Sequence, residues 1–327
     1  MSRYLLSSSA AGCALAVVVL LWPGAAGAKG PIFELEDPRG DDHGNGRLVY
    51  PLRSDFQEGD LDLLSLSARS VSGGTRFRAV FAKPVRVPLR ESVDGLGTSL
   101  SAVARHGFYT FNLDVYIDVD RELDSGARAM LPGRLAEVAG EHAWDRAIVL
   151  TPQPNEARGA LRRLVLRTMK QEVFTDQEEE VDEEWLEEMR RTLPANLDER
   201  VFFPTRITVR GRMIDFTVPD SFLGGKADPA WSYVVVVSGS DLLQRIDMSA
   251  AAGTRGLFEK NLGVLAVTNG TVQNLFGGGM PDQRLQPPLI DIIVPPGERQ
   301  EALLSDFSSR EGRPARLPGV VPAQGGR

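Results

Sequence analysis

Phe33–Pro51 reads Phe-Glu-Leu-Glu-Asp-Pro-Arg-Gly-Asp-Asp-His-Gly-Asn-Gly-Arg-Leu-Val-Tyr-Pro, a polar stretch that precedes the first regular strands. Asp37, Asp41 and Asp42 bring three carboxylates close together, and three glycines allow the backbone between them to turn at positive φ. Oxygen ligands gathered on a bent backbone suit calcium. The sequence therefore predicts a calcium site at these three aspartates. The alternative is a solvated turn that the aspartates cap by hydrogen bonds to their own backbone.

Two stretches after this turn, Leu61–Ser70 and Thr75–Ala82, alternate apolar with polar residues and are joined by Ser72-Gly-Gly74. A period of two residues is typical of a β-hairpin with one buried face. Ile207–Val218 has the same pattern around Gly211 and predicts a second hairpin. Trp144–Leu150 and Trp231–Val237 are almost entirely apolar and predict central strands. Together they predict a mainly β fold, an antiparallel β-sandwich.

A further strand is expected over Phe108–Ile117, and its polar positions provide a second candidate cation cluster. Alternation places Asp114 and Asp118 on one face of this strand, and Asp120 follows on the same side. We interpret Asp114, Asp118 and Asp120 as ligands of a cation or as carboxylates that simply face water.

The region of about 155–200 differs in composition from the strands around it. Apolar residues recur there at helical spacing among arginines and glutamates, which predicts a helical insertion over the sandwich. A short helix is expected at Gln300–Phe307. Residues 29–307 then form one domain, and the Arg-, Gly- and Pro-rich residues 308–327 are expected to be a disordered tail.

The N-terminus predicts export. Arg3 precedes the apolar run Ala10–Trp22, and Ala26-Gly-Ala28 follows as an A-x-A cleavage site. Residues 1–28 are therefore expected to be a signal peptide cleaved after Ala28, since the apolar run is shorter than the roughly 20 residues that a membrane-spanning helix requires. The mature protein would be secreted or periplasmic and would lack cysteine, since Cys13 is the only one. The net charge of −7 and the absence of a basic cluster argue against nucleic-acid binding.

Six motifs occur in the order found in the glucodextranase C-terminal domain family, and the chain resembles that family from Pro31 to Phe307. These motifs are Asp37–Gly46 with Tyr50-Pro51, Asp114–Asp118, Leu131–Arg134 with Ala143–Asp145, Val218-Pro219 with Ala230–Tyr233, Phe276–Gly279, and Ile290–Gly297. The resemblance implies an immunoglobulin-like or DOMON-like β-sandwich, related to family 9 carbohydrate-binding modules. Such domains are usually attached to secreted amylolytic enzymes, but this sequence shows no catalytic module beside the domain.

We therefore expect a non-catalytic protein that binds α-glucan or a cell-envelope polysaccharide and is stabilised by calcium. No nucleophile elbow, zinc-protease helix or Walker loop occurs in the sequence. Aromatic residues beside turns are the candidate sugar platforms: Tyr50, Tyr109, Trp231 and Tyr233. A separate secreted glycoside hydrolase or an envelope protein is a possible partner. The alternatives are a haem-binding or electron-transfer protein of the DOMON type, and a structural envelope protein without a ligand.

Overall fold

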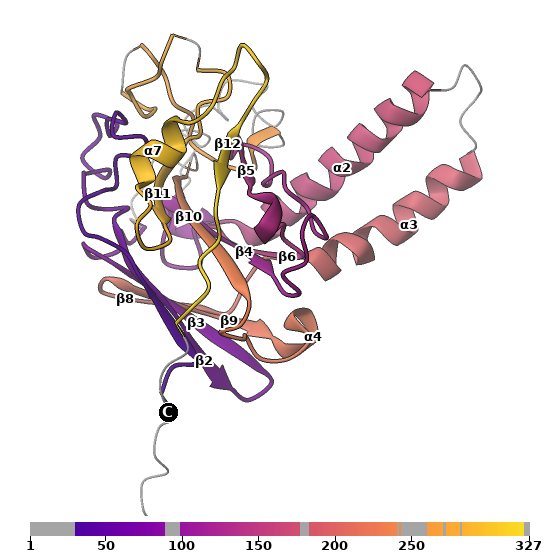
Figure 1. The fold of residues 1–327 in the computed structure, drawn as a ribbon, viewed down its shortest axis with the longest axis horizontal. Coiled ribbons are helices and arrows are strands. Elements are labelled where there is room, and N and C mark those ends of the chain that lie inside the picture. The colour runs from indigo at the N-terminus through magenta and orange to yellow at the C-terminus, as the bar shows by residue number, and fades with distance from the viewer. Residues whose placement is uncertain are drawn as a thin grey trace, which may run out of the picture. The chain divides into compact units, whose positions relative to one another are not determined.

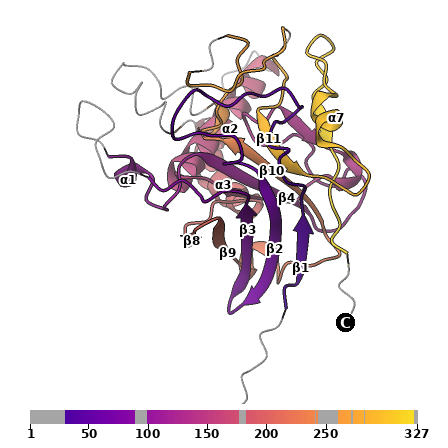
Figure 2. The same ribbon diagram turned by 90° about the vertical axis from the view of Figure 1, so that its left-hand side faces the viewer.

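Alternating sequences build the first of two five-stranded sheets in this computed structural model (Figures 1 and 2). Its strands lie in the order β1 (Phe33–Glu36), β2 (Leu63–Val71), β3 (Gly74–Phe81), β9 (Met213–Pro219) and β8 (Ile207–Arg210), and all neighbours are antiparallel. Both predicted hairpins are present, β2–β3 and β8–β9. Along β9, buried and half-buried residues alternate strictly, so this sheet has one buried face.

The second sheet lies in the order β11 (Leu289–Ile293), β10 (Ser232–Gly239), β4 (Phe111–Asp118), β6 (Arg146–Leu150) and β7 (Val201–Phe202). Its pairs are antiparallel except for β6 and β7, which are parallel. Every residue of β4, β10 and β11 is buried. This sheet is therefore covered on both faces.

Two clusters of apolar side chains explain this difference. The main core lies between the sheets and includes Phe77 and Phe216 of the first sheet and Val115 and Val235 of the second. An outer core covers the opposite face of the second sheet, where Tyr116, Val149 and Val236 pack with residues from the surrounding loops and helices. The predicted mainly β, antiparallel sandwich is confirmed.

The structure describes residues 30–88, 99–176, 183–240, 242, 260–270, 273–281 and 283–323, and those from residue 31 onward belong to one compact unit. The predicted signal peptide lies outside the described residues. Within them, we find no helix with the length and apolar character needed to cross a bilayer.

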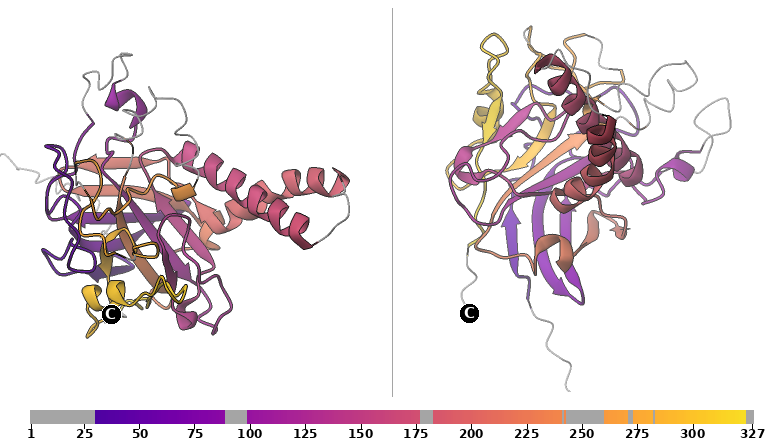
Figure 3. Two further views of the ribbon diagram at one scale, coloured as in Figure 1. Left: turned by 90° about the horizontal axis from the view of Figure 1, so that it is seen from above. Right: turned by 90° about the vertical axis from the view of Figure 1, so that its right-hand side faces the viewer.

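Two helices occupy the region where the sequence predicts a helical insertion. They are α2 (Pro154–Asp176) and α3 (Glu183–Arg200), which run side by side (Figure 3). Arg162 of α2 contacts Asp198 of α3 with an Nη2–Oδ2 distance of 2.5 Å. Because α3 leads directly into β7, the insertion begins and ends beside the edge of the second sheet. The shorter helices are α1 (Leu100–Val103), a 3₁₀ turn (Gly140–His142), α4 (Asp220–Leu223) and α7 (Gln300–Ser305).

The C-terminal residues differ from the prediction of a disordered tail. Strand β12 (Ala315–Leu317) pairs in parallel with β5 (Ala136–Val138), and Val320 exchanges two backbone hydrogen bonds with Tyr233, of 2.8 and 2.9 Å. Ala315 and Leu317 are buried, and Leu317 belongs to the outer core. Two apolar side chains at alternate positions were enough to anchor a segment whose average composition is typical of disorder.

Candidate functional site

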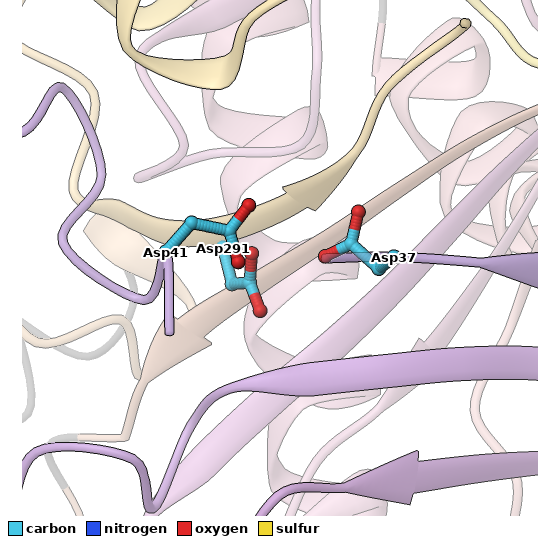
Figure 4. Close-up of side chains that lie close together, drawn as sticks. All are labelled: Asp37, Asp41 and Asp291. Atoms are coloured by element: carbon cyan, nitrogen blue, oxygen red, sulfur yellow. The ribbon is translucent and has the colours of Figure 1, made fainter. Parts of the chain in front are cut away.

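Asp37, Asp41 and Asp291 converge at one end of the sandwich (Figure 4). Asp37 follows β1 directly, and Asp291 is the central residue of β11. Asp41 lies in the segment Gly40–Gly46, which we call the Gly-rich turn. One carboxylate oxygen from each lies within 4.8 Å of the others. Two of the three predicted ligands are thus brought together, and the third carboxylate comes from a strand far along the chain.

These carboxylates lack the partners that buried polar groups normally have. Asp291 is fully buried, and its Oδ2 accepts a hydrogen bond of 2.6 Å from the Leu63 N–H, but its Oδ1 has no partner among the described residues. In the same part of the chain, neither oxygen of Asp37 has a hydrogen-bond partner, nor does Oδ1 of Asp41. The neighbouring Asp62, also buried, accepts a hydrogen bond from Gly40, and its own Oδ1 finds no partner within the residues that the structure describes.

Burial and mutual repulsion make the charged forms of these groups unfavourable. Burial, followed by the charge of Asp41, raises the pKa of Asp37 to about 8. Burial, with additional repulsion from Asp62, raises the pKa of Asp41 to about 6. Burial and then the charges of Asp37 and Asp41 raise the pKa of Asp291 well above its usual range. The cluster becomes stable when it takes up protons or when a cation lies among its oxygens.

Local contacts hold the Gly-rich turn in place against β11. The buried side chain of Gln300 donates hydrogen bonds to the carbonyls of Asp41, Gly44 and Ile290, and it accepts one from the Ile292 N–H. Gly44 has a φ of 57°, and a Cβ at this position would lie 2.5 Å from the carbonyl oxygen of Leu289. The turn can therefore approach the strand this closely only with glycine at position 44.

Asp42 was predicted as the third ligand of the calcium site, and the structure gives it a different role. Its Oδ2 accepts hydrogen bonds from the Tyr50 hydroxyl and from the Gly59 N–H, the latter at 2.7 Å. Consecutive residues point in different directions on this turn, so Asp41 joins the cluster while Asp42 fixes the following loop. Asp291 was missed from the sequence, although a single aspartate within the apolar run Leu289–Ile293 was a visible signal.

The second predicted cluster is also rearranged. Asp114 pairs with the fully buried Arg134, with an Nε–Oδ2 distance of 2.6 Å and an Nη2–Oδ1 distance of 3.1 Å. It is therefore not available to a cation. Asp118 and Asp120 do lie together, and Asp145 completes that group of carboxylates. Backbone N–H groups already donate to all three side chains, and within the described residues the buried Oδ2 of Asp118 has no partner.

Three of the four predicted sugar platforms are part of the protein interior. Tyr50, Tyr109 and Tyr233 are buried, and the Tyr233 hydroxyl donates to the carbonyl of Asp228 at 2.7 Å. A sugar ring needs an accessible aromatic face, so these three predictions are corrected. Trp231 remains a candidate, because it is only partly buried and packs at the edge of the main core. Trp144, which begins the other predicted central strand, is buried in the outer core.

Comparison with known families gives one match. A family model described as the C-terminal binding module, SLH-like, of glucodextranase matches residues 32–319. No curated protein matches the chain. The matched residues include both sheets, the Gly-rich turn, the helical insertion and β12.

Proposed function

The chain belongs to the family of SLH-like C-terminal binding modules of glucodextranase, and from this premise we propose that it is an exported, non-catalytic protein that binds polysaccharide and is stabilised by calcium. The observation that carries the proposal is the family match over nearly all of the sandwich, since the family is one of binding modules. The name of the enzyme in the family description favours an α-glucan, with a cell-envelope polysaccharide as the other candidate.

Calcium is the cofactor that the acidic cluster supports best. Calcium takes six to eight oxygen ligands, often from carboxylates on irregular backbone. Asp37, Asp41 and Asp291 supply such oxygens within reach of one another, and several of these oxygens have no hydrogen-bond partner among the described residues. A cation here would join the end of β1, the Gly-rich turn and the middle of β11. Its role is therefore structural, to hold the N-terminal segment on the sandwich.

Affinity electrophoresis tests the proposed function. The full chain is run in native gels that contain dextran, starch, xylan or cell-wall glycan, each with millimolar calcium or with EDTA. We expect retardation by an α-glucan or by the cell-wall glycan, and weaker retardation in EDTA. Equal mobility in all gels would remove the support for polysaccharide binding. Release of sugar from any of these glycans would contradict a non-catalytic role.

A further inference from the structure

A cleft of about 530 Å³ opens where both sheets meet the base of the helical insertion. Its volume is in the range of small-ligand sites. Arg146 and Phe202 come from the edge of the second sheet, Pro219 and Phe222 come from the end of β9 and from α4, and Glu199 comes from the last turn of α3. Segments that are distant in sequence therefore converge on this cleft.

Part of the cleft lining is apolar. The rings of Phe202 and Phe222 are in contact, with centroids 5.2 Å apart and an interplanar angle of 37°. Val201 and Pro219 extend this apolar surface. Phe202 is only partly buried, so part of its ring faces the cleft. The C–H face of a sugar ring packs well on such an aromatic surface.

The remaining lining residues offer both donors and acceptors of hydrogen bonds. Arg146 donates from Nη1 to the carbonyl of Leu223, and no described carboxylate forms an ion pair with it. Glu199 is exposed and likewise has no ion pair within the described residues, and Ser221 adds a hydroxyl. Arg158 and Asp198 also line the cleft but face each other, with an Nε–Oδ1 distance of 3.9 Å. A donor, an acceptor and a hydroxyl beside a ring are the groups that a sugar requires.

We propose that this cleft is the polysaccharide-binding site and that it takes a neutral glucan. The assignment rests on the proposed function, and it adds the position of the site. A neutral glycan fits because two arginines and two acidic residues line the cleft, so that its formal charges balance. The proposal also gives the helical insertion a role, since α2 and α3 contribute Arg158, Asp198 and Glu199 as one wall of the site.

Substitutions of two residues that line the cleft, Arg146 and Glu199, are the rim variants that test this assignment. Their binding is measured by affinity electrophoresis of the full chain in soluble starch and dextran. Glu199→Gln removes the acceptor charge and Arg146→Gln removes the cationic donor. A hydrogen bond to a charged group contributes a large part of the binding free energy of a weak complex. We therefore expect each variant to bind the glucan at least about tenfold less tightly. Glu188→Gln is the matched control, an exposed glutamate on the same helix that does not line the cleft, and its affinity should be unchanged.

The outcomes separate the two proposals. If wild type and the rim variants bind starch or dextran within about twofold of one another, the cleft is not the site, while polysaccharide binding stands. If wild type binds none of the glycans, the proposed function falls and the assignment of the cleft falls with it. A melting temperature for each variant identifies any loss of affinity that comes from unfolding. Carboxymethyl-dextran serves as the acidic probe, and binding tighter than that of dextran would contradict a neutral ligand.

Discussion

Two of the buried aspartates in the second sheet, Asp114 and Asp291, are stabilised in different ways. Asp114 on β4 lies against the guanidinium of Arg134, which also donates to the carbonyl of Pro132 at 2.8 Å. Asp291 on β11 lies instead among other aspartates, and no described cation pairs with it. Both are almost fully removed from solvent. The difference shows that the chain itself neutralises one buried carboxylate, whereas the other requires protons or a cation from solution.

The largest effect is expected when the ion pair between Asp114 and Arg134 is broken. Arg134→Met leaves Asp114 buried without a counter-charge, which typically costs about 3–5 kcal/mol. For a domain of this size, the melting temperature should fall by roughly 6–20 °C. Thermal unfolding followed by circular dichroism measures the change, and calcium should not restore the lost stability.

The double variant Asp114→Asn with Arg134→Met is the control. It removes the unpaired charge and should recover a large part of the loss. A melting temperature for Arg134→Met within about 2 °C of wild type would show that Asp114 does not depend on Arg134.

A smaller change in melting temperature is expected for substitution of Asp291, the buried carboxylate that the chain does not neutralise. In EDTA, Asp291→Asn removes a buried acid without a full set of partners and should raise the melting temperature by roughly 2–10 °C. In calcium the difference in melting temperature between the variant and wild type should shrink, because wild type gains stability and the variant does not. If the site binds calcium at about 10⁻⁴–10⁻³ M, as extracellular sites do, a tenfold excess gives wild type roughly 1.4 kcal/mol, or about 3–6 °C.

Asp42→Asn is the matched control for that experiment, since Asp42 lies on the same turn but contacts Tyr50 and Gly59. Its calcium shift should equal that of wild type. If Asp291→Asn keeps the calcium-induced rise in melting temperature, the calcium site lies elsewhere. The next candidates are then Asp118, Asp120 and Asp145.

The smallest effect concerns pH. The folded protein in EDTA holds protons on Asp37 and Asp41 that the unfolded chain releases near pH 4. Their stabilising contribution is complete below about pH 4, and it is lost as pH rises through about 6 for Asp41 and about 8 for Asp37. Since protons compete with calcium, the calcium shift in melting temperature at pH 5 should be less than about half of that at pH 8. An equal shift at both values would contradict this coupling.

Most of the fold could be predicted from local patterns. The alternation of Thr75–Ala82 and Ile207–Val218 predicted strands with one buried face, and both hairpins are present. For the polar face of β4 the same rule left two interpretations, a cation site or carboxylates that face water, and neither describes Asp114. Alternation assigns side chains to two faces, but it does not say what covers the second face. Here the outer core covers it and buries Asp114 with Tyr116.

The candidate site could be predicted in part. Asp37 and Asp41 are close in sequence, so their clustering was visible, but the Asp42 side chain turns to Tyr50 instead. The aromatic candidates Tyr109 and Tyr233 were chosen because they lie beside turns, and the packing of the sandwich buries them.

The sequence by itself determined most of the strands, both hairpins, the helical insertion and the acidic, Gly-rich turn, because each depends on residues that are neighbours along the chain. Only the tertiary structure decided that Asp291 joins this turn, that Arg134 neutralises Asp114, and that Arg146, Glu199 and Phe202 line one cleft. The physical reason is that charge, burial and hydrogen bonding depend on distance in space, and the pairing of strands brings together residues that no local pattern connects.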